Sequence, residues 1–266
     1  MAAYEGLVQR QDTFLAGIKL APPAFRRSPL SQRCLVSTSG AEQDARQEIV
    51  RVCRLLWERG YVAATDGNVS LRLGPNTLLA TPSGVSKGFL TPEQLVLTDL
   101  TGAPLPDERQ TVAQLRPSSE LRMHCEAYRQ RPDIRAVVHA HPPIATACTV
   151  AGVSLTEGVL PEVIVGLGGI PTARYARPSS FQGAEAIRGL IAEHDALLLD
   201  HHGSLTVGKT AFEAYLKLEK VENAAQVYLA AQQLGGIRRL PPEEVLGLMA
   251  IHRQARASGR EDNGDC

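Results

Sequence analysis

A short apolar run that ends in two histidines constrains the fold of this chain more than any other segment. Residues 134–138 are apolar except for Arg135, a pattern typical of a buried β-strand, and His139-Ala140-His141 follows directly. Because residues two apart in a strand point to the same face, both imidazoles are expected to project together from one strand end. Imidazole is a common ligand of transition metals, so the pair predicts part of a metal site.

A third histidine can come from a second apolar run. Ala196–Leu199 has the length and composition of a buried strand, and His201-His202-Gly203 follows it. Three imidazoles from two strand ends would leave a coordination position open, which is typical of catalytic metal sites. A lone histidine on an apolar strand is more often a satisfied core residue, and both interpretations of the pair stay open at this point.

Strand-like and helix-like segments alternate along residues 41–256. Apolar spacing and helix-ending residues predict helices over 43–59, 119–131, 142–152, 181–193, 211–234 and 242–256. Short apolar runs predict strands over 69–73, 77–81, 95–99, 134–139, 163–165, 196–199 and 204–207, with a flexible glycine loop over 166–169. The alternation predicts a layered α/β domain in which helices cover a central sheet. No linker divides it, so we expect one domain over 41–258.

The ends of the chain differ from this domain in composition. Residues 1–40 hold Pro22-Pro23 and Arg26-Arg27 and end in a Ser/Thr-rich segment, so we expect a poorly ordered extension. Its basic character would suit an organelle transit peptide, but Asp12 and the weak helical pattern argue against one. Residues 259–266 are polar, and we expect a flexible tail there.

Charge and cysteine content exclude several classes of protein. The chain has 28 basic and 28 acidic residues without a polybasic block, so we expect no nucleic-acid partner. No run of about 18 apolar residues is present, so we expect no membrane-spanning segment. The five cysteines are scattered and odd in number, which favours a reducing compartment over a disulfide framework. We therefore expect a cytoplasmic protein.

Three further polar segments, 65–70, 81–88 and 116–120, interrupt the apolar pattern. Turns rich in Gly, Ser and Asn expose backbone amides that bind anions, as do the first amides of a helix. Together the segments could hold a phosphate with hydroxyl and amide groups rather than with arginine. Taken alone, each is more often a plain turn or a helix cap. Glu120 is either a favourable acid in the first turn of a helix or a general acid/base beside the metal.

These segments, in this order, resemble the class II aldolase/adducin family of zinc-dependent aldolases. The resemblance covers roughly residues 43–234, and it is carried by Gly67-Asn68-Val69-Ser70, Thr81-Pro82-Ser83-Gly84, Pro117-Ser118-Ser119-Glu120, Val138-His139-Ala140-His141 and His202-Gly203. It implies an α/β fold, a single layered domain with a central, mostly antiparallel β-sheet flanked by helices.

The resemblance also implies roles for individual residues. Zinc would be held by His139, His141 and His202, because the family pattern is a histidine followed by glycine, and Glu120 would be the catalytic carboxylate. Manganese, cobalt or iron could replace zinc, since imidazole binds all of them. The substrate phosphate would be bound by Gly67, Asn68, Ser83, Gly84, Ser118 and Ser119.

The implied reaction is the cleavage of a short ketose 1-phosphate, such as fuculose 1-phosphate or a 5-deoxy- or 5-methylthio-ribulose 1-phosphate. The products would be dihydroxyacetone phosphate and an aldehyde, formed through a metal-stabilised enediolate. The implied assembly is a homo-oligomer, a tetramer. One departure concerns the aldehyde side, where such aldolases use a tyrosine. Residues 160–163 contain none, and residues 253–258 lack a second, C-terminal one. Glu162 could replace the missing acid or be an ordinary loop carboxylate.

Other activities fit the same histidines. A methylthioribulose-1-phosphate dehydratase, a pentulose-phosphate 4-epimerase or a decarboxylase would use the same kind of metal site. A non-enzymatic alternative is an adducin-like interaction module, which shares the fold but lacks the zinc histidines. Because function follows the site rather than the fold, the presence of all three histidines and Glu120 favours an enzyme.

Overall fold

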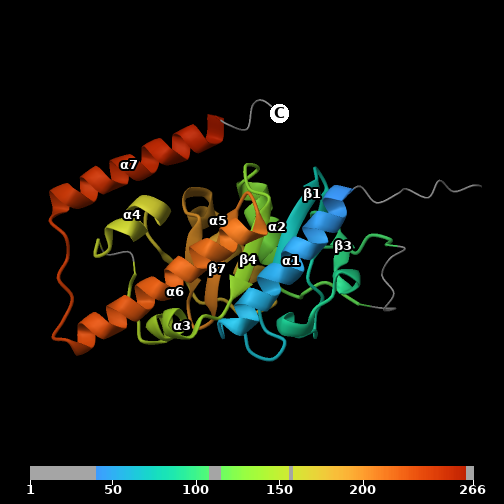
Figure 1. The fold of residues 1–266 in the computed structure, drawn as a ribbon, viewed down its shortest axis with the longest axis horizontal. Coiled ribbons are helices and arrows are strands. Elements are labelled where there is room, and N and C mark those ends of the chain that lie inside the picture. The colour runs from blue at the N-terminus through green and yellow to red at the C-terminus, as the bar shows by residue number, and fades with distance from the viewer. Residues whose placement is uncertain (1–39, 108–114, 156–157, 262–266) are drawn as a thin grey trace, which may run out of the picture. The chain divides into compact units, whose positions relative to one another are not determined.

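The strands of the described residues form a single seven-stranded β-sheet (Figure 1). The computed structural model describes residues 40–107, 115–155 and 158–261. Residues 1–39 of the predicted extension and residues 262–266 of the predicted tail lie outside these ranges. The strands are β1 (Asn68–Gly74), β2 (Thr77–Ala80), β3 (Val96–Thr98), β4 (Ala136–Ala140), β5 (Thr172–Ala173), β6 (Ala196–Leu199) and β7 (Gly203–Gly208).

The sheet is antiparallel except at one edge. Its strand order is β3-β2-β1-β4-β7-β6-β5, and only β5 and β6 pair in parallel. The strand that carries the two predicted histidines, β4, therefore lies in the middle, between β1 and β7. This arrangement confirms the predicted α/β fold with a central, mostly antiparallel sheet.

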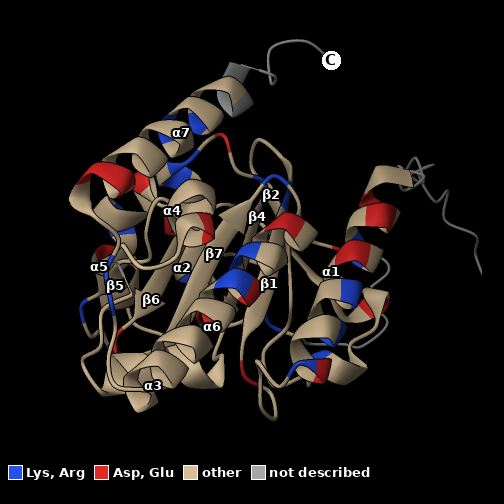
Figure 2. Cartoon of the chain, turned by 60° about the vertical axis from the view of Figure 1, so that its left-hand side comes forward, with Lys and Arg blue, Asp and Glu red and all other residues tan. Residues whose placement is uncertain are grey.

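Helices cover both faces of the sheet. The helices are α1 (Gly40–Glu58), α2 (Leu121–Gln130), α3 (Pro143–Val150), α4 (Pro161–Leu167), α5 (Phe181–Glu193), α6 (Ala211–Gln233) and α7 (Pro242–Glu261), with short 3-10 turns η1 (Lys87–Phe89) and η2 (Pro92–Gln94). The α1 and α6 helices pack on one face, and α2 and α5 pack on the other (Figure 1). Charged residues lie on the helices and on several loops, whereas the strands are drawn almost entirely in tan (Figure 2).

Alternation along β4 decides which way its histidine points. Ala136, Val138 and Ala140 belong to the core beneath α1 and α6, while Val137 belongs to the core beneath α2 and α5. His139 therefore shares the face of Val137, because strand residues two apart point the same way. Burying a side chain such as Val137 contributes roughly 1.5–3 kcal/mol, and a one-residue slip of the strand would exchange the two faces. The apolar pattern thus specifies the direction of His139.

The helix α1 shows how the sequence pattern is realised. Ile49, Val52, Cys53 and Leu56 are buried at helical spacing, as predicted. The chain turns after Glu58 at Gly60, whose φ of +69° is easily reached only by glycine. Among the helices that the structure describes, none combines the length and the apolar character needed to cross a membrane.

The predicted strand over 163–165 is wrong. These residues lie within α4, and Gly166 and Leu167 of the predicted glycine loop complete the helix. Pro161 occupies the first turn, where a missing N–H costs nothing, and Gly168 ends the helix with φ +70°. A three-residue apolar run is compatible with either a strand or a helix, so the flanking proline and glycine were the better signal. The two-residue strand β5 was not predicted.

Candidate active site

His139 and His141 lie at the end of β4, on the sheet face covered by α2 and α5. His139 is completely buried and pairs across the sheet with Asn68 of β1 and Leu205 of β7. His141 follows the last residue of the strand, and its backbone N–H donates to the Tyr61 carbonyl oxygen at 2.9 Å. Both imidazoles project from the same strand end, as the alternation predicts.

His202 reaches the same place from the turn between β6 and β7. The backbone N–H of His202 donates to the Leu199 carbonyl oxygen at 3.0 Å, which closes this turn. His201 has φ +55°, a left-handed conformation that few non-glycine residues adopt. The His201 ring pairs with Asp200, its Nδ1 lying 2.9 Å from Oδ1. Because of this turn, the His201 ring lies beside Asp200, whereas the His202 ring points toward His139 and His141.

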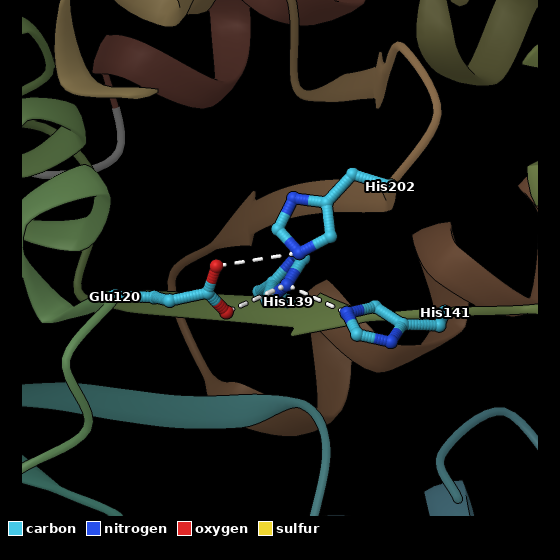
Figure 3. Close-up of side chains that lie close together, drawn as sticks. All are labelled: Glu120, His139, His141 and His202. Carbon is cyan, nitrogen blue, oxygen red and sulfur yellow. Dashed lines mark hydrogen bonds and ion pairs between the residues drawn. The ribbon is translucent and has the colours of Figure 1, made fainter. Parts of the chain in front are cut away.

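Glu120 is the residue immediately before α2, and its carboxylate reaches the same histidines. Its Oε2 lies 3.1 Å from His139 Nε2, and its Oε1 lies 3.3 Å from His202 Nε2 (Figure 3). Asn68 Nδ2 donates to Oε2 at 3.3 Å and orients the carboxylate. One ligand atom from each of Glu120, His139, His141 and His202 lies within 4.8 Å of the others. The structure therefore brings all four predicted residues together.

Hydrogen bonds determine which imidazole nitrogen faces the centre of this cluster. His139 Nδ1 lies 2.8 Å from the Ser204 carbonyl oxygen, which can only accept, so Nδ1 is protonated and Nε2 presents its lone pair. His141 is oriented alike, with Nδ1 3.6 Å from Asp66 Oδ2 and Nε2 3.1 Å from His139 Nε2. Burial and the neighbouring His139 and His202 lower the pKa of His141 to about 3. His141 is therefore neutral at pH 7.

The carboxylate and the third imidazole have matching protonation states. Burial raises the pKa of Glu120, but the hydrogen bond to His139 and the charges of the three histidines outweigh this effect, and the pKa is lowered to about 2. Burial, and after it the proximity of His139, lowers the pKa of His202. At pH 7 the Glu120 carboxylate is thus ionised, and the lowered pKa values of His141 and His202 favour the neutral forms of these two imidazoles.

This set of donors fits a divalent transition metal. Electron-rich atoms face one another across about 3 Å, and only a proton or a cation at the centre would relieve their repulsion. The lowered pKa values of His141 and His202 favour neutral imidazoles, the form in which histidine binds a metal. Glu120 Oε1 is buried and accepts no hydrogen bond from the described residues. Three imidazoles and a carboxylate are ligands that zinc accepts.

The six residues predicted to bind phosphate all line one hollow beside the cluster. Glu120, His141 and His202 line the same hollow, which we call the phosphate hollow. The hollow is lined by Gly67, Asn68, Ser83, Gly84, Ser118 and Ser119 from the three predicted polar segments. Convergence of three segments far apart in the sequence favours a shared ligand over three independent turns.

Backbone pairing holds two of these segments together. Pro82 and Pro117 form an isolated antiparallel bridge. On either side of it, the Ser83 N–H donates to the Arg116 carbonyl oxygen at 2.9 Å and the Ser118 N–H donates to the Thr81 carbonyl oxygen at 3.2 Å. The hydroxyls of Ser83 and Ser118 are thus positioned by backbone pairing, independently of a ligand, and the N–H groups of these two residues are used in that pairing.

Gly67 shows why one turn of the hollow requires glycine. Its φ is +72°, and a Cβ at this position would lie 2.5 Å from Val62 Cγ1 and 3.0 Å from the His139 carbonyl oxygen. No side chain fits between β4 and the loop that precedes β1, so glycine allows this loop to approach the histidine strand closely.

Lys87 is a residue of this hollow that was not predicted as a site residue. Its side chain is 2% exposed, and Nζ donates to the carbonyl oxygens of Thr65 at 2.6 Å and Val85 at 2.9 Å. No carboxylate of the described residues forms an ion pair with it, and burial lowers its pKa. Burying an ammonium group is costly, and the carboxylates of Asp66 and Glu120 in the same hollow offset only part of that cost, so an anionic ligand in the hollow would offset more of it. A lysine in a Ser/Gly-rich segment gives no sequence signal of such burial.

Unusual backbone conformations gather around the site. The non-glycine residues of the described chain with positive φ are Ala64 at +46°, Ser179 at +62° and His201 at +55°. Ala64 precedes the first polar segment, Ser179 lines the phosphate hollow and His201 precedes His202. Such conformations cost of order 1–3 kcal/mol each and cluster at functional sites, so their position supports a site here.

Glu162, the candidate for the missing aldehyde-side acid, does not line the site, and neither does Tyr175. Glu162 is exposed in the first turn of α4 and lines neither this hollow nor the neighbouring one formed by the described residues. Tyr175 is 60% exposed, and its ring packs edge-on to His201 at 6.3 Å. Within this chain, Glu162 therefore lies in the first turn of α4, outside both hollows.

Fold and site together define the family. The model of the class II aldolase and adducin N-terminal domain matches residues 47–229, so the chain belongs to this family. The predicted family is thereby confirmed.

Individual relatives of this chain carry two different named activities. An L-fuculose phosphate aldolase from Methanococcus maripaludis is 37% identical over 180 residues, covering 68% of this chain and 93% of the relative. A 3-oxo-tetronate 4-phosphate decarboxylase from Escherichia coli K12 is 31% identical over 211 residues, covering 74% and 96%. The crystal structure of YgbL from Escherichia coli, described as an aldolase/epimerase/decarboxylase, has a TM-score of 0.71 at 30% identity and covers 79% of this chain and 99% of that one.

The similarity to these proteins indicates the class of enzyme but not its substrate. Family membership and the aldolase relatives support a metal-dependent lyase, which agrees with the predicted enzyme. The adducin-like alternative was expected to lack the histidines, whereas this chain has the complete cluster. Relatives of two named activities match with similar coverage, so similarity alone does not select a substrate.

Proposed function

We propose that this protein is a divalent-metal-dependent aldolase that cleaves the C3–C4 bond of a short ketose 1-phosphate. The products would be dihydroxyacetone phosphate and an aldehyde, with fuculose 1-phosphate and 5-deoxy- or 5-methylthio-ribulose 1-phosphate as candidate substrates. The observation that carries the proposal is the convergence of three imidazoles and one carboxylate at the edge of a hollow rich in hydroxyl and amide groups. The relatives named L-fuculose phosphate aldolase support it.

The cation, zinc in this proposal, would be held by His139, His141 and His202, with Glu120 as a displaceable fourth ligand. When bound, a divalent cation polarises a carbonyl group and stabilises the negative charge that develops as the bond breaks, which is worth several kcal/mol. Manganese, cobalt or iron would provide similar chemistry on the same ligands.

Glu120 is proposed to move a proton to or from the three-carbon fragment. The carboxylate is ionised at neutral pH, and Asn68 fixes Oε2 by a hydrogen bond. Oε1 has no hydrogen-bond donor among the described residues, so it is available to exchange a proton. A positioned general acid/base of this kind typically contributes 10²- to 10⁴-fold to the rate.

The phosphate hollow would bind the substrate at a distance from the breaking bond. Ser83, Ser118 and Ser119 offer hydroxyl donors, and Gly67 and Gly84 allow close approach of the backbone. We propose that Lys87 supplies the positive charge that these neutral groups lack. Binding energy from this end of the substrate would orient the reacting carbonyl toward the cluster.

Decarboxylation of a phosphorylated keto acid is the second candidate reaction. The specific observation in its favour is the missing tyrosine, since residues 160–163 and 253–258 contain none. Aldol chemistry needs a group that handles the proton of the aldehyde-side oxygen, whereas loss of CO₂ from a β-keto acid does not. The relative named 3-oxo-tetronate 4-phosphate decarboxylase supports this candidate. No comparable observation favours the dehydratase or epimerase alternatives.

Product analysis tests the proposal. Zinc-loaded full-length protein would be incubated with a panel of ketose 1-phosphates and with 3-oxo-tetronate 4-phosphate, and the products identified by mass. Both reactions release dihydroxyacetone phosphate, so the co-product decides between them: an aldehyde formed from a ketose 1-phosphate identifies the aldolase, and CO₂ formed from 3-oxo-tetronate 4-phosphate identifies the decarboxylase. If no C–C bond of any of these compounds is cleaved, the proposed reaction class is wrong.

We also propose that the protein acts as a homo-oligomer, a tetramer by resemblance to its family. Sedimentation of the full-length chain only as a 28.6 kDa species would contradict this assembly.

A further inference from the structure

A second hollow adjoins the phosphate hollow. Both are lined by Glu120, Pro178, Ser179 and His202, so they meet at the candidate metal cluster. Beyond these residues their chemistry differs. The second hollow, which we call the arginine hollow, is lined by Arg122, Arg174 and Arg177. A molecule whose carbonyl lies at the cluster and whose phosphate lies in the first hollow would extend its other end into the second.

Two arginines of this hollow have no ion-pair or hydrogen-bond partner among the described residues. Arg174 and Arg177 are exposed, and within the described part of the chain neither guanidinium forms an ion pair or a hydrogen bond. Arg122 is engaged differently, since its guanidinium lies 4.3 Å from the centre of the Phe181 ring. Asp200 also lines the hollow, but its Oδ1 is 2.9 Å from His201 Nδ1 rather than beside an arginine. Two guanidinium groups are thus available to a ligand.

The segment that carries these arginines is anchored at both ends. Before Arg174, the Ala173 carbonyl oxygen of β5 accepts from the Asp200 N–H at 3.1 Å. After Arg177, Ser179 adopts its left-handed conformation with φ +62°, and its Oγ lies 2.7 Å from Ser119 Oγ of the phosphate hollow. The strained conformation and the hydrogen bond to Ser119 fix the position of this segment, and with it the position of one hollow relative to the other.

We propose that Arg174 and Arg177 form a subsite for a carboxylate at the end of the substrate remote from its phosphate. The inference rests on the proposed phosphate hollow, and it favours the second candidate reaction, because the substrates of that reaction are phosphorylated keto sugar acids rather than ketose 1-phosphates. A guanidinium matches a carboxylate through two parallel N–H···O bonds, which gives both affinity and orientation. A neutral aldehyde fragment would leave both guanidinium groups without a partner.

Two ligands that differ only in the carboxylate test this subsite. Erythronate 4-phosphate carries a phosphate and a carboxylate, and erythritol 4-phosphate has a hydroxymethyl group in place of the carboxylate. Their affinities for the zinc-loaded full-length protein would be measured by calorimetry, which requires no catalytic turnover. We expect erythronate 4-phosphate to bind about tenfold more tightly or better, as hydrogen bonds to charged groups imply.

The double variant R174Q/R177Q should abolish this difference and leave the affinity for erythritol 4-phosphate unchanged. The matched control is Arg54→Gln, which alters an exposed arginine of α1 that lines neither hollow and should change neither affinity. Equal affinity of the wild-type protein for both ligands would refute the carboxylate subsite alone, as would a difference that persists in the double variant. If neither ligand binds, the phosphate hollow and the subsite are both wrong.

Discussion

Gly203 offers a sharp test of how the site is built. It follows His202, begins β7 and faces the end of β4. A Cβ at this position would lie 2.4 Å from the Ala140 carbonyl oxygen and 2.8 Å from His141 Cδ2. Real Cβ atoms essentially never approach closer than 3.0 Å, so Gly203→Ala requires β7 or the end of β4 to move by at least about 0.6 Å.

The expected cost follows from this displacement. Overpacking of this kind typically destabilises a protein by about 1–3 kcal/mol. The movement falls on Ala140 and His141, so it also shifts a candidate ligand relative to its partners. Disturbing the support of metal ligands usually costs about 10- to 100-fold in metal affinity, and a misplacement of about 1 Å can cost 10²-fold in rate. We therefore expect Gly203→Ala to lose both stability and metal.

The assay combines urea unfolding with metal analysis of the purified variant. Gly189→Ala is the matched control, because Gly189 lies within α5 and an added Cβ would meet nothing within 4 Å. That control should gain about 0.5–1 kcal/mol from the higher helix propensity of alanine and retain its metal. A Gly203→Ala protein with wild-type stability and metal content would refute this account of the turn.

Three other substitutions test separate parts of the structure. Glu120→Gln should retain the metal but lower turnover at least about 100-fold, and unchanged turnover would remove Glu120 from the mechanism. Lys87→Met should raise the KM for a phosphorylated substrate about tenfold or more, and an unchanged KM would exclude the lysine from phosphate binding. Burial raises the pKa of Asp195, but Lys217 and Arg131 outweigh it and lower the pKa from 3.8 to about 2. This depressed pKa corresponds to about 2 kcal/mol of stability, which is present above pH 3.8 and lost as the pH falls toward 2. Urea unfolding should show Asp195→Asn less stable than wild type by about that amount at pH 7, with a smaller gap at pH 3; a gap that does not depend on pH would contradict the assignment.

Local sequence patterns predicted which way the histidine side chains point, but they did not predict that His202 lies beside His139 and His141. The alternation around Val137 and Val138 correctly placed His139 and His141 on one side of β4, because a strand has a period of two. That His202 approaches them depends on β6 and β7 pairing beside β4, which is a long-range feature without a local signal. Resemblance to the family supplied this part.

The features that the sequence did not reveal have physical reasons. A three-residue apolar run cannot distinguish a strand from a helix, so residues 163–165 were assigned to the wrong element. Lys87 is buried without a carboxylate partner, which is unusual for lysine and carries no sequence pattern. The arginine hollow depends on how the loop after β5 folds back to Ser119, and this contact joins residues that are 60 positions apart.

The central claim is that His139, His141 and His202 bind a single divalent cation together with Glu120. Anomalous diffraction at the zinc absorption edge, from crystals of full-length protein purified in the presence of zinc, tests it directly. The account predicts one strong anomalous peak within bonding distance of the three Nε2 atoms. A map without a peak at this cluster, or with its zinc bound elsewhere on the chain, would contradict it.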